Sequence, residues 1–286
     1  MQFAYIIIIA LMSMVVSCGY PLHSSLKHEN LKFPQLVITP VTSPIEVRYR
    51  PDSGLIKTNA VTQDGNTSPS EATLYMLTNI EEKEGELFWL GSMTIHDPKA
   101  AKSNLPFAVI NMRSTPLGKL LSSSVSFPAL EGKKGKEKEL DELKKAFEKI
   151  PSDFVKGISS DQVKTGDVWS ETDLSEAMDE LSDDLYSQGY RLDGPCMRGF
   201  KIKSIFKGLT HYKNKVAIVA EMDDFCQGNI INFKNAQLEV VDMRIKSFSI
   251  LERHTLFPLF GEALISVSFA RTDRNISSMY MRMESK

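Results

Sequence analysis

Alternation of apolar and polar residues is the dominant pattern along the chain. It is clear in Ile45, Val47 and Tyr49, and again in Leu87 and Trp89. A period of two places alternate side chains on one face of a β-strand, so the pattern predicts half-buried antiparallel strands. The second half of the chain carries the same strand signals, at Phe200 and Ile202, in 216–220, at Ile265, Val267 and Phe269, and at Met279, Met281 and Met283.

Helical periodicity is convincing in two segments. In 136–150 one stripe carries Leu140, Leu143, Phe147 and Ile150, and Pro151 follows it. The stripe of 172–187 carries Leu174, Met178, Leu181 and Leu185, and Gly189 is placed as a C-terminal cap. Both segments predict amphipathic helices that cover an apolar surface. The expected fold class is therefore α+β, mainly antiparallel β, with curved sheets and two amphipathic helices.

The order of these signals predicts two β-rich halves, 31–130 and 161–286, joined by a charged helix and linker at 131–160. Two segments, 113–127 and 253–269, share Thr, Pro-Leu and Gly and end in Ser-Val-Ser-Phe. Their offset is about half the chain, so a tandem duplication is one interpretation. Chance similarity between short motifs is the other.

The N-terminus carries a separate signal. Phe3 to Val16 form a mostly apolar run of 14 residues without charge, the length of a signal-peptide core and shorter than a membrane-spanning helix. Val15-Val16-Ser17-Cys18 follows and resembles the lipobox of bacterial lipoproteins. The resemblance implies that 1–17 is a signal peptide and that Cys18 becomes the lipid-modified N-terminus. Against it, Met1-Gln2-Phe3 lacks the basic residue usual in signal peptides.

The resemblance to a lipobox implies that the protein is located in the cell envelope. Gly19 after the cysteine implies delivery to an outer membrane, with the protein facing the periplasm and held by acyl chains such as palmitate. Residues 18–30 are polar and turn-prone, which predicts a flexible tether. An ordinary cleaved signal and an uncleaved apolar anchor are the alternatives.

Composition narrows the classes of partner. The formal net charge is −2, from 34 Lys and Arg against 36 Asp and Glu. Such a balance leaves no basic excess to neutralise a phosphate backbone, so nucleic acid is not expected as a partner.

The chain contains no GxSxG, HExxH, P-loop, GxGxxG or EF-hand sequence. Lys164-Thr165-Gly166 and the Ser204 to Lys207 SxxK match elements of penicillin-binding enzymes in the wrong order, which we interpret as coincidence.

Two charged segments allow a functional interpretation beside a structural one. Residues 131–149 hold seven lysines and six acidic residues, either a docking surface or a solvated helix face. Residues 165–190 hold eight acidic residues and no lysine. They form either a divalent-cation site or the solvent-exposed face of a helix. We favour the solvated face in both segments, because a cation loop needs alternating oxygen ligands on a turn.

Together these features predict a non-enzymatic cell-envelope lipoprotein that binds a lipid or other hydrophobic ligand, without cofactor, metal or catalytic residue. The expected partners are the membrane, through the N-terminal lipid, and a hydrophobic ligand or envelope protein. One alternative is a structural or assembly lipoprotein that acts through protein contacts. Another is an envelope hydrolase, in which His96, His211 or His254 would cluster with carboxylates.

The cysteines generate a testable prediction. With Cys18 set aside, Cys196 and Cys226 form an even pair in an oxidising compartment, so we expect a disulfide between them. It would stabilise the fold by roughly 3 to 4 kcal/mol in the chain-entropy model. Labelling of oxidised, denatured protein should detect neither thiol until reductant is added. Two labelled thiols before reduction would contradict the disulfide.

Overall fold

A computed structural model describes 34–64, 70–96, 106–128, 131, 140–141, 157–173, 179, 182–183, 186–187, 189–194, 201–233, 237–270 and 274–286. Within these residues the chain forms antiparallel strands in one 12-stranded sheet and one 2-stranded sheet. The first half supplies β1 (Ile45–Glu46), β2 (Asp52–Asp64), β3 (Ser70–Lys83), β4 (Glu86–His96), β5 (Ala108–Ser114) and β6 (Leu120–Ser126). The second half supplies β7 (Gln162–Val163), β8 (Val168–Asp173), β9 (Tyr190–Asp193), β10 (Lys201–Tyr212), β11 (Lys215–Asn232), β12 (Gln237–Glu252), β13 (Pro258–Phe269) and β14 (Arg274–Ser285).

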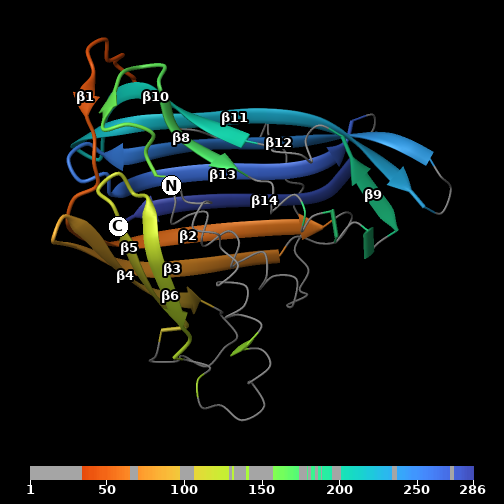
Figure 1. The fold of residues 1–286 in the computed structure, drawn as a ribbon, viewed down its shortest axis with the longest axis horizontal. Helices are drawn as coiled ribbons and strands as arrows, with labels where there is room; N and C mark the ends of the chain where they lie inside the picture. The colour runs from red at the N-terminus through yellow and green to blue at the C-terminus, as the bar shows by residue number, and fades with distance from the viewer. Residues whose placement is uncertain are drawn as a thin grey trace.

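The large sheet is built from two meanders (Figure 1). Its order is β6-β5-β4-β3-β2-β14-β13-β12-β11-β10-β8, and β9 pairs with β11. Within each meander consecutive strands are neighbours, and short turns of two to five residues make most of the connections. Glu84-Gly85 and Lys213-Asn214 have positive φ angles, from 48° to 77°. Two such residues in succession give the hairpin turn whose twist matches that of the flanking strands.

The two meanders are joined by β2 and β14. Their register runs from Ile56 opposite Ser285 to Asp64 opposite Ser277. The two predicted halves therefore contribute to one continuous sheet. The strand that carries Met279, Met281 and Met283 lies in the middle of this sheet, between β2 and β13.

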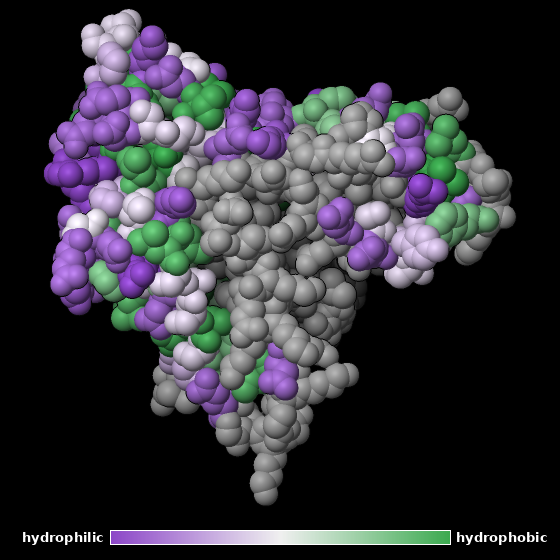
Figure 2. All heavy atoms as spheres, in the orientation of Figure 1, coloured by the Kyte–Doolittle hydropathy of each residue, from purple (hydrophilic) through white to green (hydrophobic). Residues whose placement is uncertain are grey.

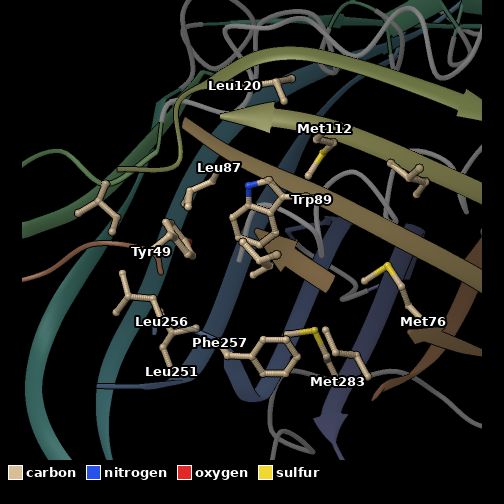
Figure 3. Close-up of a cluster of buried hydrophobic side chains, with 14 of the residues drawn as sticks. Tyr49, Met76, Leu87, Trp89, Met112, Leu120, Leu251, Leu256, Phe257 and Met283 are labelled. Atoms are coloured by element: carbon tan, nitrogen blue, oxygen red, sulfur yellow. The ribbon is translucent and has the colours of Figure 1, made fainter. Parts of the chain in front are cut away.

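The sheet bends so that side chains from its two ends meet on one face, which we call the concave face. Trp89 of β4 and Leu251 of β12 belong to the same buried cluster, together with Tyr49 and Phe257 from the connecting segments. Figure 3 shows these side chains facing one another. Register shifts in the β5–β6, β10–β11, β12–β13 and β13–β14 pairs mark bulges, which increase local bending and twist.

The opposite, convex face carries a smaller cluster. Val219, Phe248, Ile250 and Phe260 are buried there beneath Leu36 and Ile38 of the N-terminal segment. This segment reaches β10 through two backbone hydrogen bonds between Thr39 and Leu209, of 2.7 and 3.0 Å. Gly208 permits the approach: its φ is 135°, and a Cβ there would lie 2.4 Å from the Thr39 carbonyl oxygen.

The predicted α+β class, with two amphipathic helices, is wrong. The described chain is nearly all β, with helical conformation only in fragments at 140–141, 179, 182–183 and 186–187. The start of the predicted helix 172–187 belongs to strand β8. Most of 136–150 and 174–188 lies outside the described residues. The described core forms largely between concave side chains of the curved sheet, and Leu140 of the predicted segment 136–150 packs against it as a partly buried residue.

The similar segments 113–127 and 253–269 lie at corresponding places in the two meanders. One spans the end of β5, the turn and β6, and the other spans the β12 to β13 turn and β13. Val125 and Val267, the valines of the two Ser-Val-Ser-Phe sequences, are both placed by register on the concave face, opposite Ile110 and Met243. A tandem duplication stays a hypothesis.

Candidate ligand-binding face

The middle of the concave face has a floor of small side chains. The floor comprises Ala60, Ala220, Ser247, Ser249, Gly261 and Ala263, which we call the central floor. Two rows cross it: Ser247, Ala263, Met281 and Ala60 are successive cross-strand partners, as are Ala220, Ser249, Gly261 and Met283. Ala263 and the neighbouring Ile265 are partly exposed, although the surrounding positions are buried.

Methionines supply the larger side chains of this surface. Met222, Met281 and Met283 are buried beside the central floor. Gly261 makes room for one of them, since a Cβ there would lie 3.0 Å from Met283 Cε. Methionine is unbranched and polarizable, so it fills irregular space and adapts to different apolar neighbours. The face therefore combines little fixed side-chain volume with adjustable side chains.

One end of the concave face is closed by aromatic packing (Figure 3). Tyr49 meets Trp89 edge to face, with ring centroids 5.3 Å apart. Trp89 Nε1 donates a 2.8 Å hydrogen bond to Ser114 Oγ, which satisfies the indole inside the cluster. Phe257 lies over Gly54, where a Cβ would come within 2.7 Å of its ring. This end is packed core.

Most of the described ion pairs lie on the other face, whereas Asp224, which alternates with Met222 along β11, places one carboxylate on the concave side outside the central floor. Ion pairs join cross-strand or neighbouring residues of the convex side, including Lys207 with Glu221 at 3.2 Å and Arg113 with Glu86 at 3.0 Å. By register, none of the described residues in the two rows of the central floor is charged. A face of this kind favours an uncharged, largely apolar occupant, because an unpaired charge there would lose its hydration.

A buried carboxylate lies on the convex face. Glu262 is buried, and the Tyr280 hydroxyl donates a 2.5 Å hydrogen bond to its Oε1. Burial, and then this hydrogen bond, raise the pKa of Tyr280 well above its usual value. Arg282 places its guanidinium 5.2 Å from the Phe260 ring centroid beside this pair. Glu262 is separated by the sheet from the central floor.

The cysteine predictions fall largely on undescribed residues. Cys18 and Cys196 lie outside the residues that the structure describes. Cys226, on β11, is disulfide-bonded. Asp193 of β9 pairs with Asn229 of β11. Asp193 is three residues before Cys196 in the sequence, and Asn229 is three residues after Cys226. The Cys196–Cys226 pairing stays a prediction.

The histidines of the hydrolase alternative are dispersed. His96 pairs with Thr73 at the end of β4, whereas His211 pairs with Val216 on β11, at the other side of the sheet. His254 is exposed in the β12 to β13 turn, where its N–H donates to Glu252 Oε2. His211 and His254 lie at the same end, but both are exposed.

The penicillin-binding pattern is also explained by the fold. Gly166 N donates to the Phe206 carbonyl, so the Lys-Thr-Gly turn lies against β10. Ser204, however, is fully buried, whereas Lys207 pairs with Glu221. A strand with a bulge places the two side chains on opposite faces, so they do not form a nucleophile and base pair. In the described part of the chain no three His, Cys, Asp or Glu side chains gather as a metal site.

Sequence reasoning missed the hydroxyl groups of the concave face. Ser247 and Ser249 occupy positions that alternate with Ile245 and Leu251 along β12, so they share the apolar face of that strand. This alternation was the available signal.

Among the described residues, no helix has the length and apolar character needed to cross a membrane.

No family model and no curated protein matches the chain. Among solved structures, a DUF1329 family protein from Desulfovibrio piger has 8% identity and a TM-score of 0.23, over 81% of this chain and 84% of that one. An N-terminal dehydratase from the difficidin assembly line has 7% identity and a TM-score of 0.13, over 81% and 78%. These TM-scores are too low to assign either fold to this chain.

The closed end generates a pH prediction. Burial raises the pKa of Tyr49 to about 12, from 10.0. A raised folded-state pKa contributes stability that is present below pH 10 and is lost as pH rises towards 12. Between pH 8 and 11 the wild type should lose about 1.4 kcal/mol more unfolding free energy than Tyr49→Phe, measured by urea denaturation. Tyr186→Phe, an exposed control, should follow the wild type; equal losses in all three would contradict the burial effect.

Proposed function

We propose that this protein is an exported, lipid-anchored cell-envelope protein that binds a lipid or other hydrophobic ligand on the concave face of its sheet. The observation that carries the proposal is the central floor: small side chains bordered by methionines, uncharged by register and partly exposed at Ala263. Ligand sites are typically concave and mostly apolar, with a few polar groups that orient the ligand. The lipobox-like Cys18 supports the anchor.

A lipid that rests on the central floor would contact adaptable thioethers on either side. Met281 and Met283 lie in the central strand β14, and Met222 lies on β11. Their flexibility suits an acyl chain, whose shape varies between molecules. The aromatic cluster around Tyr49 and Trp89 would bound the site at one end. The ion pairs of the convex face would keep the outer surface hydrated.

An assembly role is a second candidate. Three large apolar side chains are exposed on neighbouring strands of the convex face: Leu77 of β3 at 58%, and Phe88 and Leu90 of β4 at 37% and 46%. Exposed apolar residues also occur at the projecting end of β11 and β12, where Phe233 and Leu238 lie, and Figure 2 shows green residues among purple ones there. Such residues could contact another envelope protein.

The ligand proposal is tested by filling the floor. Ala263→Phe should reduce lipid that co-purifies with the full-length protein by at least about fivefold, because the ring would occupy the surface that the ligand covers. Solvent extraction followed by mass spectrometry measures this non-covalent lipid. Thr94→Phe is the control, since Thr94 is exposed on the convex side of β4.

Stability separates the two candidate functions. If the floor is open to a ligand, Ala263→Phe should change the unfolding free energy little. If the floor is filled core, overpacking should cost about 1 to 3 kcal/mol. Wild-type protein that carries no more lipid than Ala263→Phe, together with such a loss of stability, would contradict ligand binding and favour assembly.

The anchor is tested separately. Cells that express the wild type and are fed a clickable palmitate analogue should label the protein, and Cys18→Ser should abolish the label because the acceptor thiol is lost. Cys226→Ser is the matched control and should retain it. Persistent labelling of Cys18→Ser would contradict lipidation at this cysteine.

A further inference from the structure

Three buried hydroxyl groups on the concave face lack a hydrogen-bond partner among the described residues. They are Ser204 Oγ, Ser247 Oγ and Thr78 Oγ1. Their residues are only 0%, 4% and 1% exposed. A buried hydroxyl without a partner costs about 1 to 3 kcal/mol, and native proteins leave few such groups unsatisfied. Three on one face therefore call for a common explanation.

The strand registers place two of these hydroxyls beside the central floor. Ser247 lies opposite Ala263 on one side and Met222 on the other. Ile205 of β10 lies opposite Glu221 of β11. Because the two strands are antiparallel, the preceding residue, Ser204, lies beside the following one, Met222. Ser204 also alternates with Ile202 and Phe206, both fully buried on the concave side. Met222 thus separates two serines that are roughly 10 Å apart, the width of two strand spacings.

Thr78 lies at the closed end of the same face. Its cross-strand partners are Gly54 and Gly91, so neither neighbour carries a side chain that could accept its hydrogen bond. The ring of Phe257 lies over Gly54. The site therefore has two hydroxyls at the central floor and a third near the aromatic end, with mainly apolar surface between them. Asp224, paired with Ile245 in the next row of the same face, places a carboxylate beside the two serines and would repel an anionic ligand.

The chemistry of the missing partner follows from these surroundings. A serine hydroxyl both donates and accepts, so it pairs with a carbonyl oxygen or another hydroxyl. Because the described rows of the floor are uncharged, no cation is available there to pair with a buried carboxylate. A pure hydrocarbon would leave both serines unpaired. The occupant that fits has acyl chains and neutral oxygen atoms.

We infer that the concave face binds a neutral acyl ester, such as a mono- or diacylglycerol, whose ester and hydroxyl oxygens pair with Ser204 and Ser247. This inference rests on the proposed function and specifies its ligand class. The acyl chain contacts Met222 and Met281, and the ester lies over the central floor.

The test compares three probes of similar chain length: 1-monooleoylglycerol, oleate and 1-octadecene. Each competes with a fluorescent acyl probe for full-length protein that has been stripped of lipid and held in an amphipathic polymer. The wild type should bind 1-monooleoylglycerol at least about fivefold more tightly than either competitor. Ser204→Ala and Ser247→Ala should each weaken the affinity for 1-monooleoylglycerol by about 5- to 30-fold. Both should leave the affinity for 1-octadecene unchanged.

A matched control is available on the other face. Ser278 is also buried and its Oγ also lacks a described partner, but its position in β14 alternates with Met279 and Met281, which places it on the convex side. Ser278→Ala should leave all three affinities unchanged. None of the three substitutions should lower the melting temperature, because each removes a hydroxyl that makes no hydrogen bond with the described residues.

The outcomes distinguish the two levels of the proposal. If none of the probes binds the wild type, the proposed function is overturned. If all three bind equally and the serine variants change nothing, a lipophilic site stands but the ester inference is overturned, and water satisfies the hydroxyls. Tighter binding of oleate than of the ester would also overturn it. Selective loss of ester binding in Ser204→Ala and Ser247→Ala, but not in Ser278→Ala, supports the inference.

Discussion

The structure depends on the pairing of β2 with β14. This ladder joins a strand near the start of the described chain to the C-terminal strand, and it links the β2 to β6 meander to the β10 to β14 meander. Without it, both strands would present unpaired edges, and Ile56 and Ala60 would lose the neighbouring Met281 and Met283. Because the partners are far apart in sequence, the ladder carries a high loop-closure cost and requires the complete C-terminal strand.

Closure of this ladder produces a sheet whose two faces differ in chemistry. The concave face gathers large side chains at the closed end and small residues with methionines in the middle. The convex face carries ion pairs and the buried Glu262 and Tyr280 pair. Segregation of this kind favours an uncharged ligand on one side and water or protein contacts on the other. It connects the strand pattern directly to the proposed function.

The proposed ligand class depends on the unsatisfied hydroxyls of Ser204 and Ser247. A core selected only for stability would place alanine or valine at Ser204 and Ser247, since a buried hydroxyl without a partner is unfavourable. Local departures from the rules of stable packing are expected at functional sites, where another requirement is met. The contrast with the closed end is informative, because Trp89 Nε1 there finds an internal acceptor in Ser114.

Period-two alternation identified the strands around Trp89, Ile202, Val267 and Met281, because the polypeptide backbone itself places alternate side chains on one face. The same alternation could not show which strand lies at an edge of the sheet, and it gave no sign that β14, which carries Met279, Met281 and Met283, is central. Helical periodicity at 172–187 predicted a helix, whereas the first two residues of this range belong to strand β8. Residue order alone thus determined strands, turns and the candidate signal at Cys18. Only tertiary structure decided that Ser204, Ser247 and Ala263 share one concave face, because that arrangement depends on long-range pairing and on bulges that no local pattern encodes.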